Sequence, residues 1–396
     1  MTGKPWDAPR RVLYISSYLS PGAYGRLLSA APYPPSQAAQ KYNALITAGF
    51  VENGAEVTAL SAPPVSPATS KRRVVFLKGE RAGGVRFCYL PAIALPGIKQ
   101  ALTWLSAFVS TLMLCKRDTL VLCYGLIVSA SAGARAAARL LGRPVSVIVS
   151  DLPEELGSGK AMALAAKDLT RYDGYILLTE AMNSRVNPQG KPYLVMEGMA
   201  DRGLADRENR LDDKAPGRVC LYAGMLHARY GILRLVEAFQ MVKNPQARLV
   251  LYGAGDAREA IQEAAKADGR IQYRGVKDNA AVVEAEFAAS LLINPRPSDE
   301  AFTKYSFPSK NLEYMASGTP VLTTPLPGMP QAYLPYVYLF EGETPGEMAK
   351  TLEALLALPP QTLHEKGLAA RAFVLENRSN LAQAARLLAF LEGLCR

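Results

Sequence analysis

The feature that most constrains the fold of this chain is a regular alternation of strand-like and helix-like segments. Val12–Ser17 is an apolar strand-like run, a helical pattern covers Gln37–Val51, and the next strand-like run is Glu56–Leu60. More strand-like runs, with one clear helix at Ala130–Leu141 among them, follow at Val85–Leu90, Thr119–Cys123, Val145–Val149 and Tyr175–Leu178. Strands that alternate with helices form parallel sheets with right-handed crossovers.

The alternation stops at the charged stretch Ala200–Gly217, which we interpret as a linker or peripheral loop, and then restarts. The second series has predicted strands at Val219–Ala223, Arg248–Tyr252, Ile271–Tyr273, Leu291–Asn294 and Pro320–Thr324. Its predicted helices are Leu233–Val242, Ala257–Lys266, Asn279–Ala289 and Ser309–Ala316. The pattern predicts the α/β class with two Rossmann-like, doubly wound domains, 1–200 and 201–379. An apolar helix at 380–396 is expected to pack back on the first domain.

The positive charge of the chain is confined to its first half. Residues 1–200 hold 22 Lys and Arg against 12 Asp and Glu, whereas residues 201–396 hold 23 of each kind, so the formal net charge of +10 belongs to the first half. This asymmetry fits either a basic surface that keeps the protein soluble or a polyanionic partner. Because no zinc-finger spacing or aromatic-interleaved basic strip occurs, we expect no nucleic acid and favour an anionic membrane surface.

Cysteine usage and hydropathy predict a cytoplasmic location, with or without peripheral attachment to the inner face of the membrane. The five cysteines form no CxxC pair, which fits a reducing compartment, and Met1–Arg11 lacks the apolar run of a signal peptide. Ala101–Cys115 is uncharged but shorter than a membrane span of about 20 residues. It is either a buried helix or a helix that dips into a membrane face beside Lys99, Lys116 and Arg117.

The segment from Asn294 to Pro320, NPRPSDEAFTKYSFPSKNLEYMASGTP, is the strongest candidate for a binding site. A strand ends at Asn294, and Ser309 is expected to cap a helix that Gly318 closes. The positive end of that helix, together with Lys310, would hold a diphosphate, and Glu313 one turn later would accept hydrogen bonds from a ribose diol. Alternatively, Lys310 and Glu313 are ordinary first-turn residues.

Three other loops of the second half have residues suited to a nucleotide. Gly224 allows close backbone approach and Arg229 can pair with phosphate. Tyr252 with Gly253, and Gly275 with Val276, follow the next two strands, where the backbone could contact phosphate or a uracil edge. Each loop alone could be a plain strand-to-helix turn, but together they predict a nucleotide site on one sheet edge.

The stretch Leu312–Val321, LEYMASGTPV, resembles the LEAMASGxPV stretch of the retaining GT-B glycosyltransferases of glycosyltransferase family four. The resemblance covers most of residues 219–375 and is specific around 291–328, and looser likenesses occur at Gln40–Asn43 and Val149–Leu152. It implies a GT-B fold with two domains facing a central cleft, and a nucleoside-diphosphate sugar, UDP by the family's habits, bound by the second domain. The first domain would bind a glycan, lipid-linked or glycolipid acceptor, as in bacterial polysaccharide synthesis.

This chain departs from the family pattern at several positions. Glu313 matches the second glutamate of the family's E-x7-E motif, but Tyr305 stands in place of the first. Met225 and Tyr230 stand where the family has the Arg and Lys of its GRL…KG loop. Arg229 and Lys310 are therefore the expected substitutes that neutralise phosphate.

A DxD motif, the metal-binding sequence of other glycosyltransferase folds, is absent, so we expect no metal and no other cofactor. The only histidines, His227 and His364, lie in the second half, which excludes a first-domain histidine as general base. The resemblance favours retention, with the departing phosphate helping to deprotonate the acceptor. Asp151, after the strand Val145–Val149, is the expected first-domain catalytic residue and Glu154 its substitute; Asp151 could instead cap the next helix or loop.

Three alternatives to a transferase remain open from the sequence. The loss of the first motif glutamate allows a catalytically silent glycosyltransferase-like subunit. The same fold also serves UDP-sugar epimerases. A dinucleotide-dependent oxidoreductase would have to use Tyr252–Asp256, whose glycine pattern is incomplete.

Overall fold

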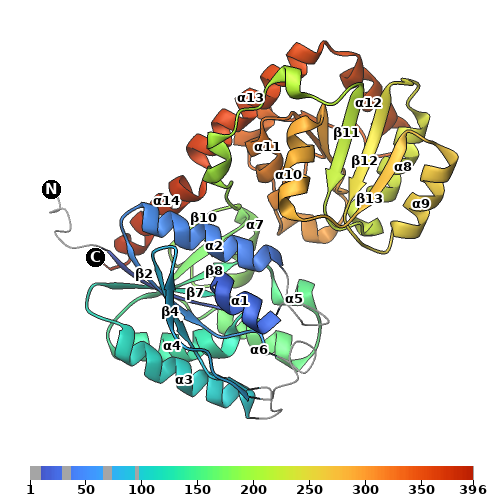
Figure 1. Ribbon diagram of the computed structural model, residues 1–396. Coiled ribbons are helices and arrows are strands. Elements are labelled where there is room, and N and C mark those ends of the chain that lie inside the picture. Colours follow the sequence, from blue (N-terminus) through green and yellow to red (C-terminus); the bar gives the residue numbers. More distant parts are fainter. Residues whose placement is uncertain (1–9, 29–36, 66–73, 94–97, 396) are drawn as a thin grey trace. The chain divides into compact units, whose positions relative to one another are not determined.

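The computed structural model describes residues 10–28, 37–65, 74–93 and 98–395 (Figure 1). Most of the segment Met1–Arg11, which carries the prediction about a signal peptide, lies outside these residues. The chain forms two compact units, one of Met1–Met199 with Asn380–Arg396 and the other of Ala200–Ser379. Both are α/β units built on parallel sheets, so the predicted fold class is confirmed.

The first unit is built on a sheet with the strand order β10-β9-β8-β7-β1-β2-β5-β4. Neighbouring strands are parallel, except that β4 is antiparallel to β5. The sheet strands are β1 (Arg11–Ser16), β2 (Glu56–Ser61), β4 (Glu80–Ala82), β5 (Val85–Tyr89), β7 (Thr119–Tyr124), β8 (Val145–Val149), β9 (Gly174–Leu177) and β10 (Tyr193–Val195). A separate antiparallel pair is formed by β3 (Val74–Val75) and β6 (Ala92–Ile93).

The helices of the first unit cover both faces of this sheet, which explains why β7 and β8 are buried along their whole length. Figure 1 shows α2 and α14 on one face and α3 and α4 on the other. The helices are α1 (Pro21–Leu28), α2 (Gln37–Glu52), α3 (Lys99–Leu114), α4 (Val128–Leu140), α5 (Pro153–Leu156), α6 (Lys160–Leu169), α7 (Glu180–Val186) and the C-terminal α14 (Asn380–Gly393).

The C-terminal helix α14 packs on α2 at a position that requires glycine. A Cβ atom on Gly49 would lie 2.2 Å from the carbonyl oxygen of Asn380, so a side chain there would force the two helices apart. Asn53 Nδ2 donates to the Leu381 carbonyl at 2.9 Å, and Gln383 Nε2 donates to the Gly198 carbonyl at 2.8 Å. The last helix is therefore an integral part of the first unit.

The second unit has a wholly parallel sheet with the order β13-β12-β11-β14-β15-β16. Its strands are β11 (Arg218–Ala223), β12 (Ala247–Tyr252), β13 (Ile271–Gly275), β14 (Leu291–Asn294), β15 (Val321–Thr323) and β16 (Tyr338–Leu339). Its α-helices are α8 (Ile232–Met241), α9 (Arg258–Ala267), α10 (Asn279–Ala288), α11 (Ser309–Ser317), α12 (Pro345–Ala357) and α13 (Pro360–Asn377). Short 3₁₀ helices are η1 (Arg202–Asp206), η2 (Leu211–Asp213), η3 (Ala228–Tyr230), η4 (Ala301–Lys304) and η5 (Gln331–Tyr336).

The stretch Ala200–Gly217, interpreted from sequence as a linker or peripheral loop, is anchored on the second unit and is not a free linker. Asn209 is buried, and its Nδ2 donates to the Ser317 carbonyl at 2.8 Å. Arg371 donates to the Leu204 carbonyl at 2.7 Å. Lys214 Nζ donates to the Phe287 carbonyl at 2.7 Å and to Thr319 Oγ1 at 2.8 Å. The polar residues that suggested a linker are the ones that fix this segment.

Lys214 makes the stability of this segment dependent on pH. Burial lowers the pKa of its ammonium group to about 7, against a weaker opposing effect of the Asp213 carboxylate. Between that value and the ordinary lysine pKa the unfolded chain binds more protons than the folded one, so the free energy of unfolding rises with pH. From pH 7 to 9 we expect a gain on the order of 1 to 2 kcal/mol that Lys214→Met abolishes. Urea unfolding at both pH values tests this; the exposed Lys350→Met is the control, and an equal gain in all three proteins would contradict it.

Candidate functional site

The strand order of the second sheet reverses between β11 and β14, and this is where the candidate site lies. The chain builds β12 and β13 on one side of β11, and then β14 and β15 on the other. At such a switch point the loops that follow the two central strands diverge and leave a crevice at the carboxyl edge. A Cβ atom on Gly231, whose φ is 79°, would lie 2.0 Å from the Pro295 carbonyl oxygen, so the two loops pack closely at their base.

Helix α11 is fixed at this edge by buried hydrogen bonds. The Tyr314 hydroxyl accepts from the Ala223 amide at 2.8 Å and lies 3.2 Å from the Ala223 carbonyl, at the end of β11. Asn294 Nδ2, at the end of β14, donates to Asn311 Oδ1 at 2.8 Å. These bonds hold the first turn of α11 at the carboxyl edge of β11 and β14.

The predicted cap of α11 was wrong by one residue. Pro308 is the N-cap and makes no side-chain capping bond, and Ser309 is already the first helical residue. The ring of Pro308 restricts its φ, and the extended backbone of this residue ends the loop, so the helix begins one position earlier than it would with a serine cap. The left-handed Gly318, with φ of 81°, closes the helix as predicted. The amides of the first turn, including those of Ser309 and Lys310, are the ones that an α-helix leaves without an intrahelical acceptor.

Lys310 and Glu313 lie on one face of that first turn. Lys310 Nζ is 3.4 Å from Glu313 Oε2, and both side chains are partly buried. The Lys310 ammonium and Glu313 carboxylate groups are thus adjacent, an arrangement that can contact a phosphate and a sugar hydroxyl of one ligand. Tyr305 lies at the end of η4, where its amide donates to the Phe302 carbonyl at 3.0 Å.

The second group of predicted residues forms a chain of backbone contacts along the same edge. The Gly224 amide donates to the Tyr252 carbonyl at 3.0 Å, and the Gly253 amide donates to the Gly275 carbonyl at 2.9 Å. Gly253 has a φ of 132°, and its Cβ atom would lie 1.7 Å from the Gly224 carbonyl oxygen. Val276 follows with 71% of its surface exposed. These residues line up at the ends of β11, β12 and β13.

The glycines of Tyr252–Asp256 have a packing role. A Cβ atom on Gly255 would lie 2.1 Å from the Leu226 carbonyl oxygen, so this glycine lets the loops after β11 and β12 meet. Asp256 Oδ1 accepts from the Ala228 amide at 2.8 Å, and that bond is the main reason why the pKa of Asp256 is lowered. The glycine pattern is explained without a dinucleotide.

Arg296, which the sequence analysis did not single out, is the most unusual charged residue of the site. Its guanidinium carbon lies 4.7 Å from the ring centre of Tyr230 and 5.6 Å from that of Phe302. Nη1 is 3.4 Å from Ser306 Oγ, while the buried Nε has no hydrogen-bond partner. No carboxylate among the described residues forms an ion pair with it, and burial lowers its pKa.

Arg229 lies on the same two aromatic rings. Its guanidinium carbon is 4.6 Å from the ring centre of Phe302 and 5.4 Å from that of Tyr230. Its charge also lowers the pKa of Arg296, so two cations are held close to each other. Within the described part of the chain no acid neutralises either one. Arg296 also places a cation against the ring of Tyr230.

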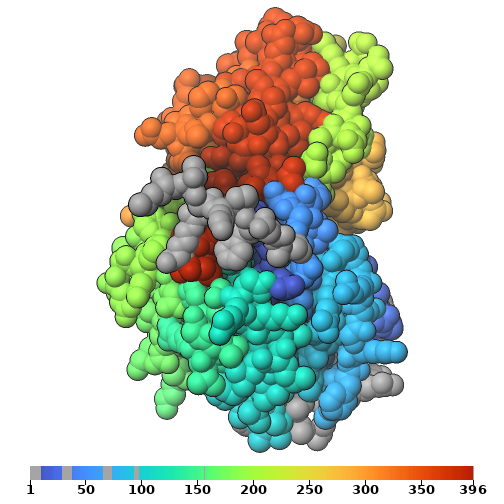
Figure 2. Space-filling model, turned by 90° about the vertical axis from the view of Figure 1, so that its left-hand side faces the viewer, coloured from blue at the N-terminus to red at the C-terminus, as the bar shows by residue number. Residues whose placement is uncertain are grey.

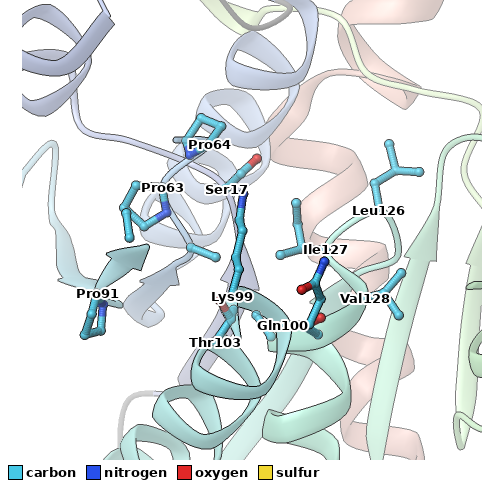
Figure 3. Close-up of a pocket in the computed structure, with 14 residues that line it drawn as sticks. Ser17, Pro63, Pro64, Pro91, Lys99, Gln100, Thr103, Leu126, Ile127 and Val128 are labelled. Atoms are coloured by element: carbon cyan, nitrogen blue, oxygen red, sulfur yellow. The ribbon is translucent and has the colours of Figure 1, made fainter. Parts of the chain in front are cut away.

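In the first unit, a pocket lies at the carboxyl ends of β1, β2, β5 and β7 and has a volume of about 290 Å³. Figure 3 shows the Lys99 side chain in the middle of the pocket, with Pro63 and Pro64 on one side and Leu126–Val128 on the other. Lys99 Nζ donates to the Val65 carbonyl at 2.9 Å. The pocket therefore combines apolar walls with one ammonium group.

Asp151 and Glu154, the predicted first-domain residues, are both exposed beyond the end of β8. The Ser150 hydroxyl donates to Asp151 Oδ2 at 2.9 Å, and Tyr124 Oη lies 2.8 Å from Ser150 Oγ. Because Ser150 donates its proton to the carboxylate, Tyr124 is the donor in the second bond. Asp151 does not cap α5, whose N-cap is Leu152 without a side-chain bond. Glu154 lies 3.8 Å from an Arg185 nitrogen.

Comparison with known proteins agrees with this architecture. Residues 217–357 match the family model of the glycosyl transferases group 1. No curated protein matches the chain in sequence. Three solved structures match along nearly the whole chain: sucrose-phosphate synthase from Thermosynechococcus elongatus (18% identity, TM-score 0.67, 97% of this chain and 99% of that chain), Anabaena HepE in complex with UDP (14%, 0.63, 97% and 100%), and an α,α-trehalose-phosphate synthase from Burkholderia xenovorans (10%, 0.66, 96% and 100%).

These likenesses establish the fold as GT-B, with two Rossmann-like domains. The group 1 domain covers the strands and loops that form the candidate site. The group 1 domain assigns residues 217–357 to the glycosyltransferases, a class of enzymes.

Proposed function

We propose that this enzyme is a family-four type glycosyltransferase that moves a sugar from a UDP-sugar to a glycan or lipid-linked acceptor, with retention. The observation that carries the proposal is the pair Arg229 and Arg296, two cations without an acid partner among the described residues, at the switch point of the second sheet. A largely buried guanidinium such as that of Arg296, next to a second cation and without an anion, is electrostatically costly unless a ligand supplies one. A nucleoside diphosphate has the required charge.

The roles of the other donor residues follow from this placement. The first-turn amides of α11 and Lys310 would add to the positive field around the diphosphate, and Glu313 would accept hydrogen bonds from the ribose diol. Charge that develops on the leaving diphosphate would then be stabilised by groups already in place. Support for uridine comes from Anabaena HepE, whose solved structures include complexes with UDP and UDP-glucose.

The acceptor would bind in the first unit. The pocket around Lys99 offers apolar walls and an ammonium group, a combination suited to a phosphate attached to a lipid or a sugar. Asp151 would orient the acceptor hydroxyl through the carboxylate that Ser150 holds in place. The net charge of the first half supports an anionic acceptor or membrane surface and a peripheral location.

The proposal is tested by mass spectrometry of the purified protein incubated with UDP- and GDP-sugars and a crude membrane lipid extract. We expect released UDP together with a new sugar-bearing lipid.

Tyr305, in the place of the first motif glutamate, favours one alternative, a catalytically silent binding subunit. UDP binding without any turnover, also when soluble sugar phosphates are supplied, would support that alternative. Sugar interconversion without an acceptor would indicate an epimerase, and failure to bind UDP would overturn the donor site.

Lys310→Ala and Glu313→Ala should each weaken UDP binding by roughly ten-fold, because each removes one charged contact to the nucleotide. Titration calorimetry with UDP measures this effect. The matched controls are Glu263→Ala and Lys266→Ala, which break another pair three residues apart, on α9, with Nζ and Oε1 at 2.7 Å. The two control variants should bind UDP normally. Normal binding by both Lys310→Ala and Glu313→Ala would exclude α11 from the donor site.

Metal removal should leave the activity unchanged. The proposal assigns neutralisation of the diphosphate to Arg229, Arg296, Lys310 and the α11 terminus, and gives no step to a divalent ion. Protein that has been incubated with EDTA should keep at least about half of the untreated rate in the transfer assay. Loss of activity that Mg²⁺ or Mn²⁺ restores would show that a metal takes part.

A further inference from the structure

Helix α3 of the first unit has an apolar face that faces solvent. Ile98, just before the helix, and Leu105, Val109 and Met113 within it follow one another at intervals of four or seven residues, and therefore share one face. Their exposed fractions are 50%, 51%, 46% and 79%. We call these four residues the α3 stripe. Its two ends, Ile98 and Met113, are 15 positions apart, or about 22 Å along the helix.

The opposite face of α3 is the one that packs on α4. Ala107 and Thr111 are buried there, and a Cβ atom on Gly133 of α4 would lie 2.2 Å from the Trp104 carbonyl oxygen. The sequence interpretation of 101–115 as a buried helix is therefore wrong for half of its surface. In Figure 2 the turquoise surface of α3 and α4 lies toward the viewer. No part of the chain that the structure describes covers the α3 stripe.

Basic residues lie at one end of this apolar face and on one flank. Lys116 and Arg117 follow α3 and are exposed. On its flank Trp104 lines a hollow together with Arg135, Arg139 and Arg171. Arg135 is neutralised by Asp168, with nitrogen–oxygen distances of 3.0 and 2.6 Å, whereas Arg171 is exposed. Apolar side chains rimmed by cations match the boundary between acyl chains and anionic headgroups.

We propose that the α3 stripe docks the first unit on an anionic lipid surface, with α3 lying in the plane of the headgroups. Helix α3 has 16 residues, fewer than the roughly 20 that a membrane-spanning helix needs. Among the described residues, no helix is long and apolar enough to cross a membrane. The excess of positive charge in residues 1–200 adds a general attraction to such a surface. The inference deepens the proposed function, on which it rests for a lipid-linked acceptor.

Flotation of the full-length protein with vesicles tests the docking. Wild-type protein should float with vesicles of equal parts phosphatidylglycerol and phosphatidylcholine, and much less with phosphatidylcholine alone. The triple variant Leu105→Gln, Val109→Gln, Met113→Gln should lower the partition coefficient by roughly ten-fold or more. Lys116→Glu with Arg117→Glu should lower it by a similar factor, and less so at high salt. The control is Leu164→Gln, at an apolar position of α6 that is 66% exposed, and should float like wild type.

Several outcomes would overturn the docking. Wild-type protein that does not float, or a triple variant that floats as well as Leu164→Gln, would exclude the α3 stripe. A wild-type dimer that the triple variant converts to a monomer, with neither form bound to vesicles, would instead make the stripe a contact between two copies. UDP affinity is measured for every variant and should not change. If the wild-type protein floats but does not bind UDP, only the donor proposal is overturned. If it binds UDP normally but does not float, only the docking is overturned.

Discussion

Arg296→Met should weaken UDP binding by roughly 10- to 100-fold while leaving the melting temperature unchanged or raising it. A hydrogen bond between a charged donor and a phosphate contributes about 1.5–3 kcal/mol, and each 1.4 kcal/mol is a factor of ten in affinity. The effect on stability has the opposite sign, because the native guanidinium is partly buried with an unpartnered Nε. Methionine keeps the apolar contact with Tyr230 and Phe302 and removes that unpaired charge.

The opposite signs separate a ligand-binding role of Arg296 from a structural one. Titration calorimetry with UDP and thermal unfolding are measured on the same preparations. Arg296→Lys should retain part of the affinity, since it keeps the charge but loses the planar contact with the rings. Arg248→Ala, which removes a positive charge at the amino end of β12, is the control and should bind UDP normally. A lower melting temperature of Arg296→Met with unchanged UDP affinity would make this arginine structural.

The location of the candidate site could be predicted from the sequence because it depends on local patterns. Apolar strand runs separated by helical periodicity give the order of elements, and parallel strands end at one edge. The predicted strand Leu291–Asn294 is β14 with the same bounds, and the predicted helix Ser309–Ala316 is α11 less one residue. Gly318, which the sequence predicted to close that helix, has the left-handed backbone of a helix C-cap.

Arg296 could not be found in this way because its importance depends on contacts between distant segments. Its aromatic neighbours Tyr230 and Phe302 come from the loops after β11 and β14, which only the switch point brings together. The sequence signal was a cation two residues after the end of a buried strand, a position that marks ligand contacts in this fold class. The sequence showed that Tyr230 differs from the family that it resembles. That Arg296 lies against the Tyr230 ring depends on the tertiary structure.

The exposed face of α3 was hidden from the sequence for a related reason. A helix that is apolar around its whole circumference does not indicate which face its neighbour covers. Gly133 decides this, because only a residue without a side chain lets α4 approach the backbone of α3 at Trp104. The charged stretch Ala200–Gly217 shows the converse, since its polar side chains Asn209 and Lys214 donate hydrogen bonds to backbone carbonyls of the second unit.

Asp151→Asn should lower the turnover number by roughly 100- to 10,000-fold, the range in which positioned carboxylates act in proton transfer and orientation. The asparagine keeps the size of the side chain, and its Oδ1 can still accept the proton of Ser150. The change therefore removes one negative charge without disturbing the bond that positions the group. UDP affinity should stay within about two-fold of the wild-type value, because the donor residues belong to the second unit.

Neighbouring variants distinguish a specific role of Asp151 from a general effect of charge. Glu155→Gln removes the same charge from an exposed carboxylate four residues along and should retain the wild-type rate. Ser150→Ala should cause an intermediate loss of about ten-fold, since it frees the carboxylate from the bond to Ser150 while keeping the charge. Steady-state transfer of sugar from a UDP-sugar is measured for all four variants: Asp151→Asn, Glu155→Gln, Ser150→Ala and Glu154→Gln. A rate for Asp151→Asn equal to that of Glu155→Gln would remove Asp151 from the mechanism, and a large loss in Glu154→Gln would move the role to that residue.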